Sequence, residues 1–154
     1  MGERVRIVKY SKTHWKEVRT IINEVTSKWG KEWKQHMLKF YNPRNKFGDD
    51  VFRYVALVNG RLVATMSVKS EVDACVIYFL AVKKEFREIG MGGKLINFAE
   101  RFAKRKKLSI MRVDTAEDFA ENIKFYKWHG FKVSGKVRNV YVKADSHVFL
   151  WKKV

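Results

Sequence analysis

The sequence contains very little cysteine and lacks long apolar runs. Cys75 is the only cysteine among the 154 residues, which excludes an internal disulfide and any zinc site built from several cysteines. No stretch approaches the roughly 18 consecutive apolar residues that indicate a membrane helix. Residues 1–10, MGERVRIVKY, lack the apolar segment of a secretory signal peptide. We therefore expect a soluble cytoplasmic protein with no bound metal and no membrane contact.

Acidic residues are scarce relative to basic ones. The chain has 33 Lys and Arg against 16 Asp and Glu, which gives a formal net charge of +17 at pH 7. A surface of this kind attracts polyanions such as nucleic acid or phosphate-bearing ligands. The densest basic run, residues 104–107 (KRKK), is expected at the C-terminal end of a helix, where cations suit the helix dipole. The run is thus either a local, solvated feature or a nucleic-acid patch.

Apolar and aromatic residues are plentiful. Hydrophobic residues make up 46% of the chain, with five Trp, six Tyr and eleven Phe. A chain of this length and composition can bury a sizeable core, so disorder is not expected. Length and composition predict a single domain that covers residues 1–154.

Hydrophobic periodicity predicts alternating helices and strands. Helices are expected at 15–29, 31–41, 91–106 and 118–129, because apolar residues recur there at three and four positions. Strands are expected at 3–10, 51–58, 61–69, 74–82, 108–113, 131–142 and 147–153. Asn59-Gly60 is a strong signal for a hairpin between the second and third strands.

Residues 80–95, LAVKKEFREIGMGGKL, join a buried strand to an amphipathic helix through a glycine-rich turn. Such a turn directs backbone N–H groups and the positive end of the helix dipole toward one point, which suits a phosphate. A P-loop is excluded because Gly93-Lys94 is followed by Leu95 instead of Ser or Thr. A dinucleotide fingerprint is excluded because it also needs a glycine at Leu95. An ordinary strand–helix turn is the alternative interpretation.

Two motifs resemble the GNAT (GCN5-related N-acetyltransferase) superfamily. The first is Arg87-x-x-Gly90-x-Gly92 after an apolar strand, and the second is N-x-x-F-Y-x-x-x-G-F at residues 122–131. The resemblance implies an α/β (α+β) fold with a central, mixed, mostly antiparallel seven-stranded sheet and about four helices. The implied order, β-α-α-β-β-β-α-β-α-β-β, agrees with the elements that periodicity predicts.

The resemblance also implies acetyl-CoA as co-substrate. The backbone of Leu80 and Val82 would bind the pantetheine arm, and Asn122 and Tyr126 would contact the coenzyme. Glu88 departs from the usual pattern, in which a small or basic residue is commoner. The pyrophosphate would be held by the loop residues Arg87, Glu88, Ile89, Gly90, Met91, Gly92 and Gly93.

The implied reaction is direct attack of a primary amine on the acetyl thioester in a ternary complex. Tyr126 would be the general acid for the leaving thiolate, although the residue could instead be an ordinary packing tyrosine. Asp114, at the end of the fifth strand, is the candidate general base, and its alternative role is to cap the next helix. Cys75 lies inside a buried strand without an evident activating partner, so it is not expected to be a nucleophile.

The first functional hypothesis is an acetyl-CoA-dependent N-acetyltransferase that acts on a small-molecule or peptide amine. The alternative is a basic nucleic-acid-associated or coenzyme A-sensing module with the same fold and little catalysis. The sequence is compatible with a monomer or a homodimer. The aromatic residues that could line the acceptor side are Trp29, Trp33, Phe40, Tyr41, Phe47 and Tyr141, although most of them are expected to be core residues.

Overall fold

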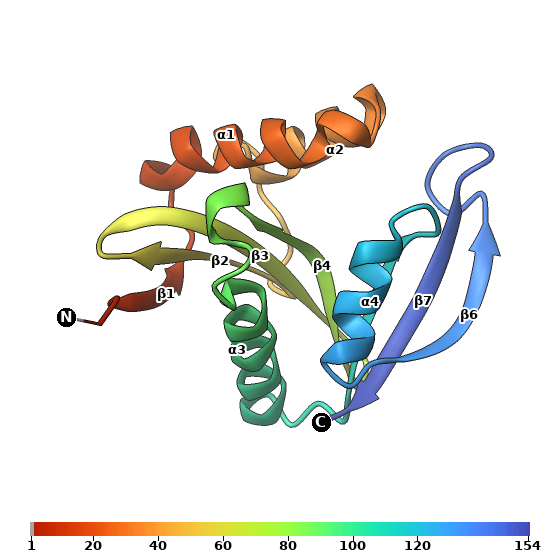
Figure 1. Ribbon diagram of the computed structural model, residues 1–154. Helices are drawn as coiled ribbons and strands as arrows, with labels where there is room; N and C mark the ends of the chain where they lie inside the picture. Colours follow the sequence, from red (N-terminus) through yellow and green to blue (C-terminus); the bar gives the residue numbers. More distant parts are fainter. Residues whose placement is uncertain (1) are drawn as a thin grey trace. The chain divides into compact units, whose positions relative to one another are not determined.

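The computed structural model describes residues 2–154 as a mixed α/β fold (Figure 1). The helices are α1 (Trp15–Val25), α2 (Lys31–Tyr41), α3 (Met91–Arg105) and α4 (Ala120–Trp128), with short 3-10 turns at Lys12–His14, Thr26–Lys28 and Lys84–Phe86. The strands are β1 (Val5–Lys9), β2 (Val51–Val58), β3 (Arg61–Glu71), β4 (Ala74–Val82), β5 (Ile110–Ala116), β6 (Lys132–Arg138) and β7 (Ser146–Lys153). The predicted element order and fold class are confirmed.

The strands form a seven-stranded sheet in the order β1-β2-β3-β4-β5-β7-β6. Strands β4 and β5 are parallel, with Ala74 opposite Ile110 and Ile77 opposite Val113. The pairs β1–β2, β5–β7 and β6–β7 are antiparallel. The sheet is therefore mixed, as predicted, and α3 is the helix that connects the two parallel strands β4 and β5.

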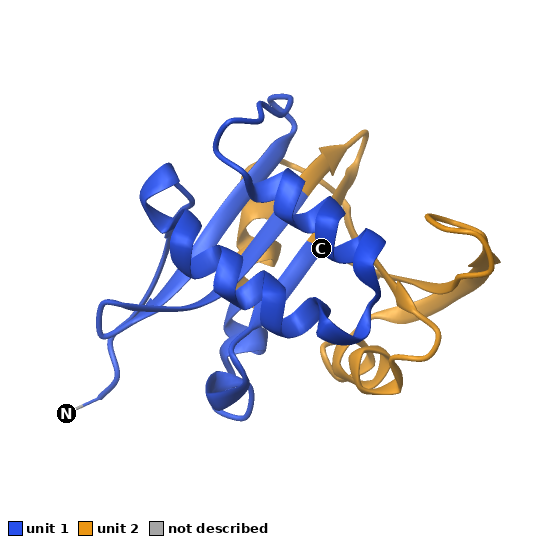
Figure 2. Ribbon diagram, turned by 90° about the horizontal axis from the view of Figure 1, so that it is seen from above, with its two compact units in different colours: residues 1–68, 79–95 blue, residues 69–78, 96–154 orange. Residues whose placement is uncertain are grey.

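The chain forms two compact units, coloured separately in Figure 2. Unit 1 comprises residues 1–68 and 79–95, and unit 2 comprises residues 69–78 and 96–154. Because β3, β4 and α3 each contribute residues to both units, neither unit is a contiguous segment of sequence. The single domain over residues 1–154 stays a prediction.

In unit 1, the structure contains the hairpin turn and the buried helix face that the sequence predicted. Asn59 and Gly60 both have positive φ angles, of 50° and 83°, as the tight turn of the β2–β3 hairpin requires. The Asn59 side chain also accepts a hydrogen bond from the backbone N–H of Arg4 at 2.9 Å, which ties the turn to the start of β1. Val18, Ile21 and Ile22 of α1 are fully buried, so the predicted amphipathic face is the one that packs.

An arginine organises the aromatic residues of unit 1. The Arg53 guanidinium lies over four rings, at 5.0 to 5.9 Å from the centroids of Tyr10, Phe40, Tyr41 and Phe47. It also donates a hydrogen bond to the Phe40 carbonyl at 3.0 Å. These contacts join β2 to the end of α2 and to Phe47 in the segment that follows it.

In unit 2, β5 extends beyond its predicted end and therefore includes Asp114. The predicted strand ended at Val113, whereas β5 runs to Ala116 and Asp114 pairs with Phe149 of β7 inside the sheet. Strand β7 contributes Val148 and Leu150 to the core, while every residue of β6 is exposed. Strand β7 is thus partly buried, whereas β6 forms an exposed edge of the sheet.

The turn between β3 and β4 carries a strained residue. Val72 has a φ of 50° and a fully exposed side chain, and a β-branched residue is strongly disfavoured in this backbone region. We predict that Val72→Asn, which tolerates a positive φ, raises the free energy of unfolding by about 1 kcal/mol in urea titrations. The control is Val137→Asn, at an exposed valine outside the positive-φ set, which should give no gain. A loss of stability in Val72→Asn would contradict the prediction.

Candidate functional site

The glycine-rich turn between β4 and α3 is open and exposed. Residues 87–90 are all exposed, and Gly90 has a φ of 81°. A Cβ added at Gly90 would meet no atom within 4 Å. The positive φ angle, and not a lack of space, is therefore what favours glycine at this position. Helix α3 begins at Met91, and the first N–H groups of any α-helix lack intrahelical acceptors. The turn therefore presents backbone donors at a helix N-terminus, as predicted.

Two charged side chains hold this turn in place within unit 1. The Arg87 Nε donates a hydrogen bond to the Val82 carbonyl at 2.9 Å, which closes the turn on the end of β4. Glu24 of α1 accepts a hydrogen bond from the Lys84 N–H at 3.1 Å and lies 3.8 Å from Arg87 Nη2. The Arg87 side chain thus shapes the turn. Sequence reasoning missed Glu24, because no motif relates it to residues sixty positions away.

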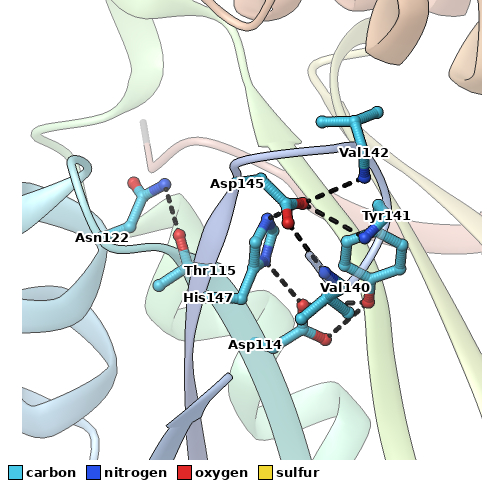
Figure 3. A network of polar contacts seen from close by, with 8 residues as sticks. All are labelled: Asp114, Thr115, Asn122, Val140, Tyr141, Val142, Asp145 and His147. Carbon is cyan, nitrogen blue, oxygen red and sulfur yellow. Dashed lines mark hydrogen bonds and ion pairs between the residues drawn. The ribbon is translucent and has the colours of Figure 1, made fainter. Parts of the chain in front are cut away.

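Asp114 is the centre of a polar network in unit 2 (Figure 3). Its carboxylate accepts hydrogen bonds from the Tyr141 hydroxyl, at 3.0 Å to Oδ1 and 2.9 Å to Oδ2. Its Oδ2 also lies 2.9 Å from Nδ1 of His147. The predicted role of Asp114 as a helix cap is wrong, because α4 begins after Phe119 and Asp114 lies inside β5.

The network continues through His147 to the connection between β6 and β7. The Nε2 of His147 lies 3.3 Å from Oδ2 of Asp145. Asp145 in turn accepts backbone N–H groups of Val140, Tyr141 and Val142 at 2.7, 3.2 and 3.4 Å. Although burial opposes the effect, these backbone donors lower the pKa of Asp145 below its ordinary value. A single carboxylate therefore shapes the connection that carries Tyr141.

Tyr126 is a buried residue of α4 whose ring packs against Phe125 and Phe131, with centroids at 5.1 and 5.5 Å. Burial and the negative charge of Asp114 both raise the pKa of Tyr126 above its ordinary value. The phenol therefore stays protonated at neutral pH. Asn122, one turn earlier on α4, donates a hydrogen bond to the Thr115 hydroxyl at 3.3 Å, which links α4 to β5.

The predicted site residues thus fall into two groups. Unit 1 holds Leu80, Val82 and the turn from Arg87 to Gly93, and unit 2 holds Asp114, Asn122 and Tyr126. Sequence reasoning missed His147 and Asp145 in unit 2. The only available signal was their position, Asp145 in the predicted turn near residues 144–145 and His147 at the start of the predicted last strand, which carries no chemistry by itself.

The aromatic residues predicted along the acceptor side differ in burial. Tyr41 is fully buried, and its hydroxyl accepts a hydrogen bond from Thr65 at 3.2 Å. Trp29 packs edge-to-face on Trp33 and on Phe79, at 6.4 and 6.0 Å between centroids. Phe47 and Tyr141 are exposed, at 37% and 44% of their surface. Of this set, Tyr141 is the residue that contacts a predicted catalytic group.

Cys75 lies fully buried in β4, and burial raises the pKa of its thiol to about 12. We predict that iodoacetamide alkylates this thiol at pH 8.5 at least about 100-fold more slowly in the native protein than in the unfolded chain, where the thiol pKa is about 8.5. Mass spectrometry of samples with and without guanidinium measures the difference. Rapid, complete alkylation of the native protein would show that the thiol is accessible and restore Cys75 as a candidate nucleophile.

Comparisons with solved structures agree with this fold. Similar solved structures include the ribosomal-protein-S18-alanine N-acetyltransferase from Escherichia coli, with a TM-score of 0.77 and 14% identity over 98% of this chain and 94% of that one. PaiA N-acetyltransferase from Thermoplasma acidophilum, in complex with coenzyme A, has a TM-score of 0.79 and 18% identity over 98% and 99% of the two chains. Ard1 from Thermoplasma volcanium has a TM-score of 0.77 and 20% identity over 97% of each chain. At these identities the likeness shows the fold alone.

Curated proteins gave no match to the sequence. Within residues 2–154 no helix is long and apolar enough to cross a membrane. In the same described residues, no group of three or more His, Cys, Asp or Glu side chains is arranged to hold a metal ion.

The sequence itself identifies the family. Residues 15–131 match the acetyltransferase (GNAT) family, and this range includes the glycine-rich turn, Asp114, Asn122 and Tyr126. The match covers well over half of the chain and confirms the resemblance that the two motifs indicated. The chain therefore belongs to the acetyltransferase (GNAT) family and is an acyltransferase.

Proposed function

We propose that the protein is an acetyl-CoA-dependent N-acetyltransferase in which Asp114 accepts the proton of a primary amine and Tyr126 is the hydrogen-bond donor to the leaving sulfur. The observation that carries the proposal is the electrostatic relation between these two groups. Burial and the Asp114 carboxylate keep the Tyr126 phenol protonated. A carboxylate close to a phenol that stays protonated offers a proton acceptor and a hydrogen-bond donor, the two groups that acetyl transfer to an amine requires.

The residues of the β4–α3 turn fit a pyrophosphate group. The turn is exposed, Gly90 leaves open space on its surface, and the amides that open α3 at Met91, Gly92 and Gly93 are donors at the positive end of a helix. Residues 87–93 would hold the phosphates, and the backbone of Leu80 and Val82 would bind the pantetheine arm. The co-substrate supplies an acetyl group activated as a thioester.

In the proposed reaction, Asp114 of unit 2 takes the proton that the amine loses. The amine nitrogen forms a bond to the acetyl carbon as the carbon–sulfur bond breaks, and the proton that the nitrogen loses goes to a carboxylate oxygen of Asp114. The sulfur leaves with the bonding electron pair and needs a proton or a hydrogen bond. Asp114 then releases its proton to solvent, and the thiolate ends as a thiol after taking a proton from solvent.

Because the pKa of Tyr126 is raised, its role in this reaction is to donate a hydrogen bond and not to transfer its proton. Complete transfer of its proton to a thiolate with a conjugate-acid pKa of about 8.5 is unfavourable, because an ordinary phenol already has a pKa of about 10. A protonated phenol is nevertheless a good hydrogen-bond donor to developing negative charge. Tyr126 therefore stabilises the departing sulfur, and Asn122 orients α4 through Thr115.

The acceptor is a primary amine of a small molecule or a peptide. One structural neighbour is named for the N-acetylation of an alanine of ribosomal protein S18, which supports including peptide N-termini among the candidates. A panel of peptide N-termini, polyamines and aminoglycosides, assayed for coenzyme A release, tests the proposal. No release with any amine, together with no calorimetric binding of acetyl-CoA at millimolar concentration, would overturn it.

The coenzyme A-sensing and nucleic-acid hypotheses remain alternatives. Binding of acetyl-CoA without turnover would favour a sensor. A gel shift that weakens steeply with salt would favour nucleic-acid binding. The basic run is exposed at residues 104–107, where Lys104 lies 3.4 Å from Glu100 on the same helix.

The Gly90 position offers a matched test of phosphate binding. Both Gly90→Asn and Gly90→Asp place a side chain of nearly the same shape in open space, and both residues tolerate a positive φ. We predict that the Asp variant binds coenzyme A at least about tenfold more weakly than the Asn variant, because only Asp adds a negative charge beside the phosphates. Equal dissociation constants by calorimetry would mean that the phosphates lie elsewhere.

Tyr126→Phe separates catalysis from packing. The ring contacts with Phe125 and Phe131 remain and only the hydroxyl is lost. We predict that kcat falls by about 10²- to 10³-fold, with little change in the dissociation constant for acetyl-CoA. Because the pKa of Tyr126 is raised above its ordinary value, its ionisation should cause no fall in the wild-type rate below about pH 10. Normal turnover of the variant, with chemistry rate-limiting, would show that Tyr126 only packs.

A further inference from the structure

We propose that Tyr141, His147 and Asp145 are positioning residues that hold the Asp114 carboxylate with one oxygen left to take the proton of the acceptor amine. The inference rests on the proposed function, since it explains how the suggested base is held. It concerns residues of unit 2 alone, from β5, β7 and the β6–β7 connection (Figure 3).

The contacts of Asp114 leave a defined acceptor site. A carboxylate has about four lone-pair positions, two on each oxygen. Oδ2 is contacted by both the Tyr141 hydroxyl and His147 Nδ1, each at 2.9 Å, whereas Oδ1 is contacted by the Tyr141 hydroxyl at 3.0 Å. Oδ1 therefore keeps a lone pair that can accept the amine proton.

His147 holds one side of this carboxylate because its ring is itself held at both nitrogens. Its side chain is only 7% exposed, with Asp114 at Nδ1 and Asp145 at Nε2. A ring protonated on both nitrogens donates to both carboxylates, whereas a neutral ring donates from one nitrogen only. The Tyr141 ring also packs on the His147 ring at 4.9 Å between centroids.

Asp145 supports both neighbours of Asp114. Its Oδ2 faces His147 Nε2 and accepts the Tyr141 backbone N–H, so one carboxylate orients the imidazole and the strand connection that carries the phenol. The other titratable groups near Asp114 are Tyr78 of β4 and Tyr126 of α4, whose pKa values are raised first by burial and then by the Asp114 charge.

Two substitutions at His147 distinguish its contacts. Asn places its amide nitrogen close to the position of Nδ1 and can keep the hydrogen bond to Asp114. Gln reaches the position of Nε2 and keeps only the contact with Asp145. We expect His147→Gln to lower kcat by about 10- to 100-fold, as misplacing a catalytic group does. We expect His147→Asn to recover most of that loss, and neither change to alter the KM for acetyl-CoA.

A double-mutant cycle decides whether His147 acts through Asp114. We expect His147→Gln to lower kcat in the wild-type background and to have no further effect in the Asp114→Asn background, because the group being positioned is then absent. Additive effects on kcat would overturn the inference. So would equal turnover of the Gln and Asn variants. Urea unfolding and acetyl-CoA binding of each variant confirm that the folded enzyme is compared.

Tyr141→Phe provides a second route if the buried histidine cannot be changed without unfolding. Tyr141 is 44% exposed, and the change removes only the hydroxyl that contacts Asp114. Its effect on kcat should also vanish in the Asp114→Asn background, and an additive effect would overturn the inference. Full turnover of Asp114→Asn alone has a different meaning: the proposed base is then wrong, whatever the variants at His147 and Tyr141 show.

Discussion

A histidine enclosed between two carboxylates is the constraint on which the unit 2 site depends. The side chains of His147, Asp145 and Asp114 are only 7%, 12% and 16% exposed. Groups of this kind cannot leave water without paired charges and satisfied hydrogen bonds, since an isolated buried charge costs several kcal/mol. Each therefore restricts its neighbours: β5 must present Asp114, β7 must present His147, and the β6–β7 connection must turn so that Asp145 faces the ring.

The Asp114 carboxylate also acts on two tyrosines of unit 2. The negative charge of Asp114 adds to burial in raising the pKa of Tyr126, which keeps the phenol protonated, and Asp114 accepts the Tyr141 hydroxyl. Moving Asp114 would thus change the electrostatics of α4 and the position of the β6–β7 connection together. The proposed base and the proposed hydrogen-bond donor are thus coupled through one carboxylate, and the side chains that hold this carboxylate come from β7 and the β6–β7 connection.

In unit 1, charged side chains likewise fix the positions of a turn and of a group of aromatic rings. Arg87 closes the β4–α3 turn on Val82, and Glu24 bonds that turn to α1. Arg53 gathers four aromatic rings around its guanidinium, an arrangement that suits a planar, weakly hydrated cation better than an ammonium group. Part of the net charge of +17 therefore stabilises the fold, and that part needs no polyanionic partner to explain it.

Patterns local in sequence determined the element order, the Asn59-Gly60 hairpin and the glycine-rich turn before α3. Periodicity, glycine placement and turn residues act over a few positions, so each could be predicted from the chain alone. The tertiary structure decided the contacts that join distant positions: Glu24 with Lys84, Arg53 with the aromatic rings, and Asp114 with His147. It also extended β5 beyond Val113, because pairing with β7 stabilises three more residues than their own propensity would. A histidine in a strand looks alike in sequence whether or not carboxylates enclose it, and only folding brings those carboxylates to its ring.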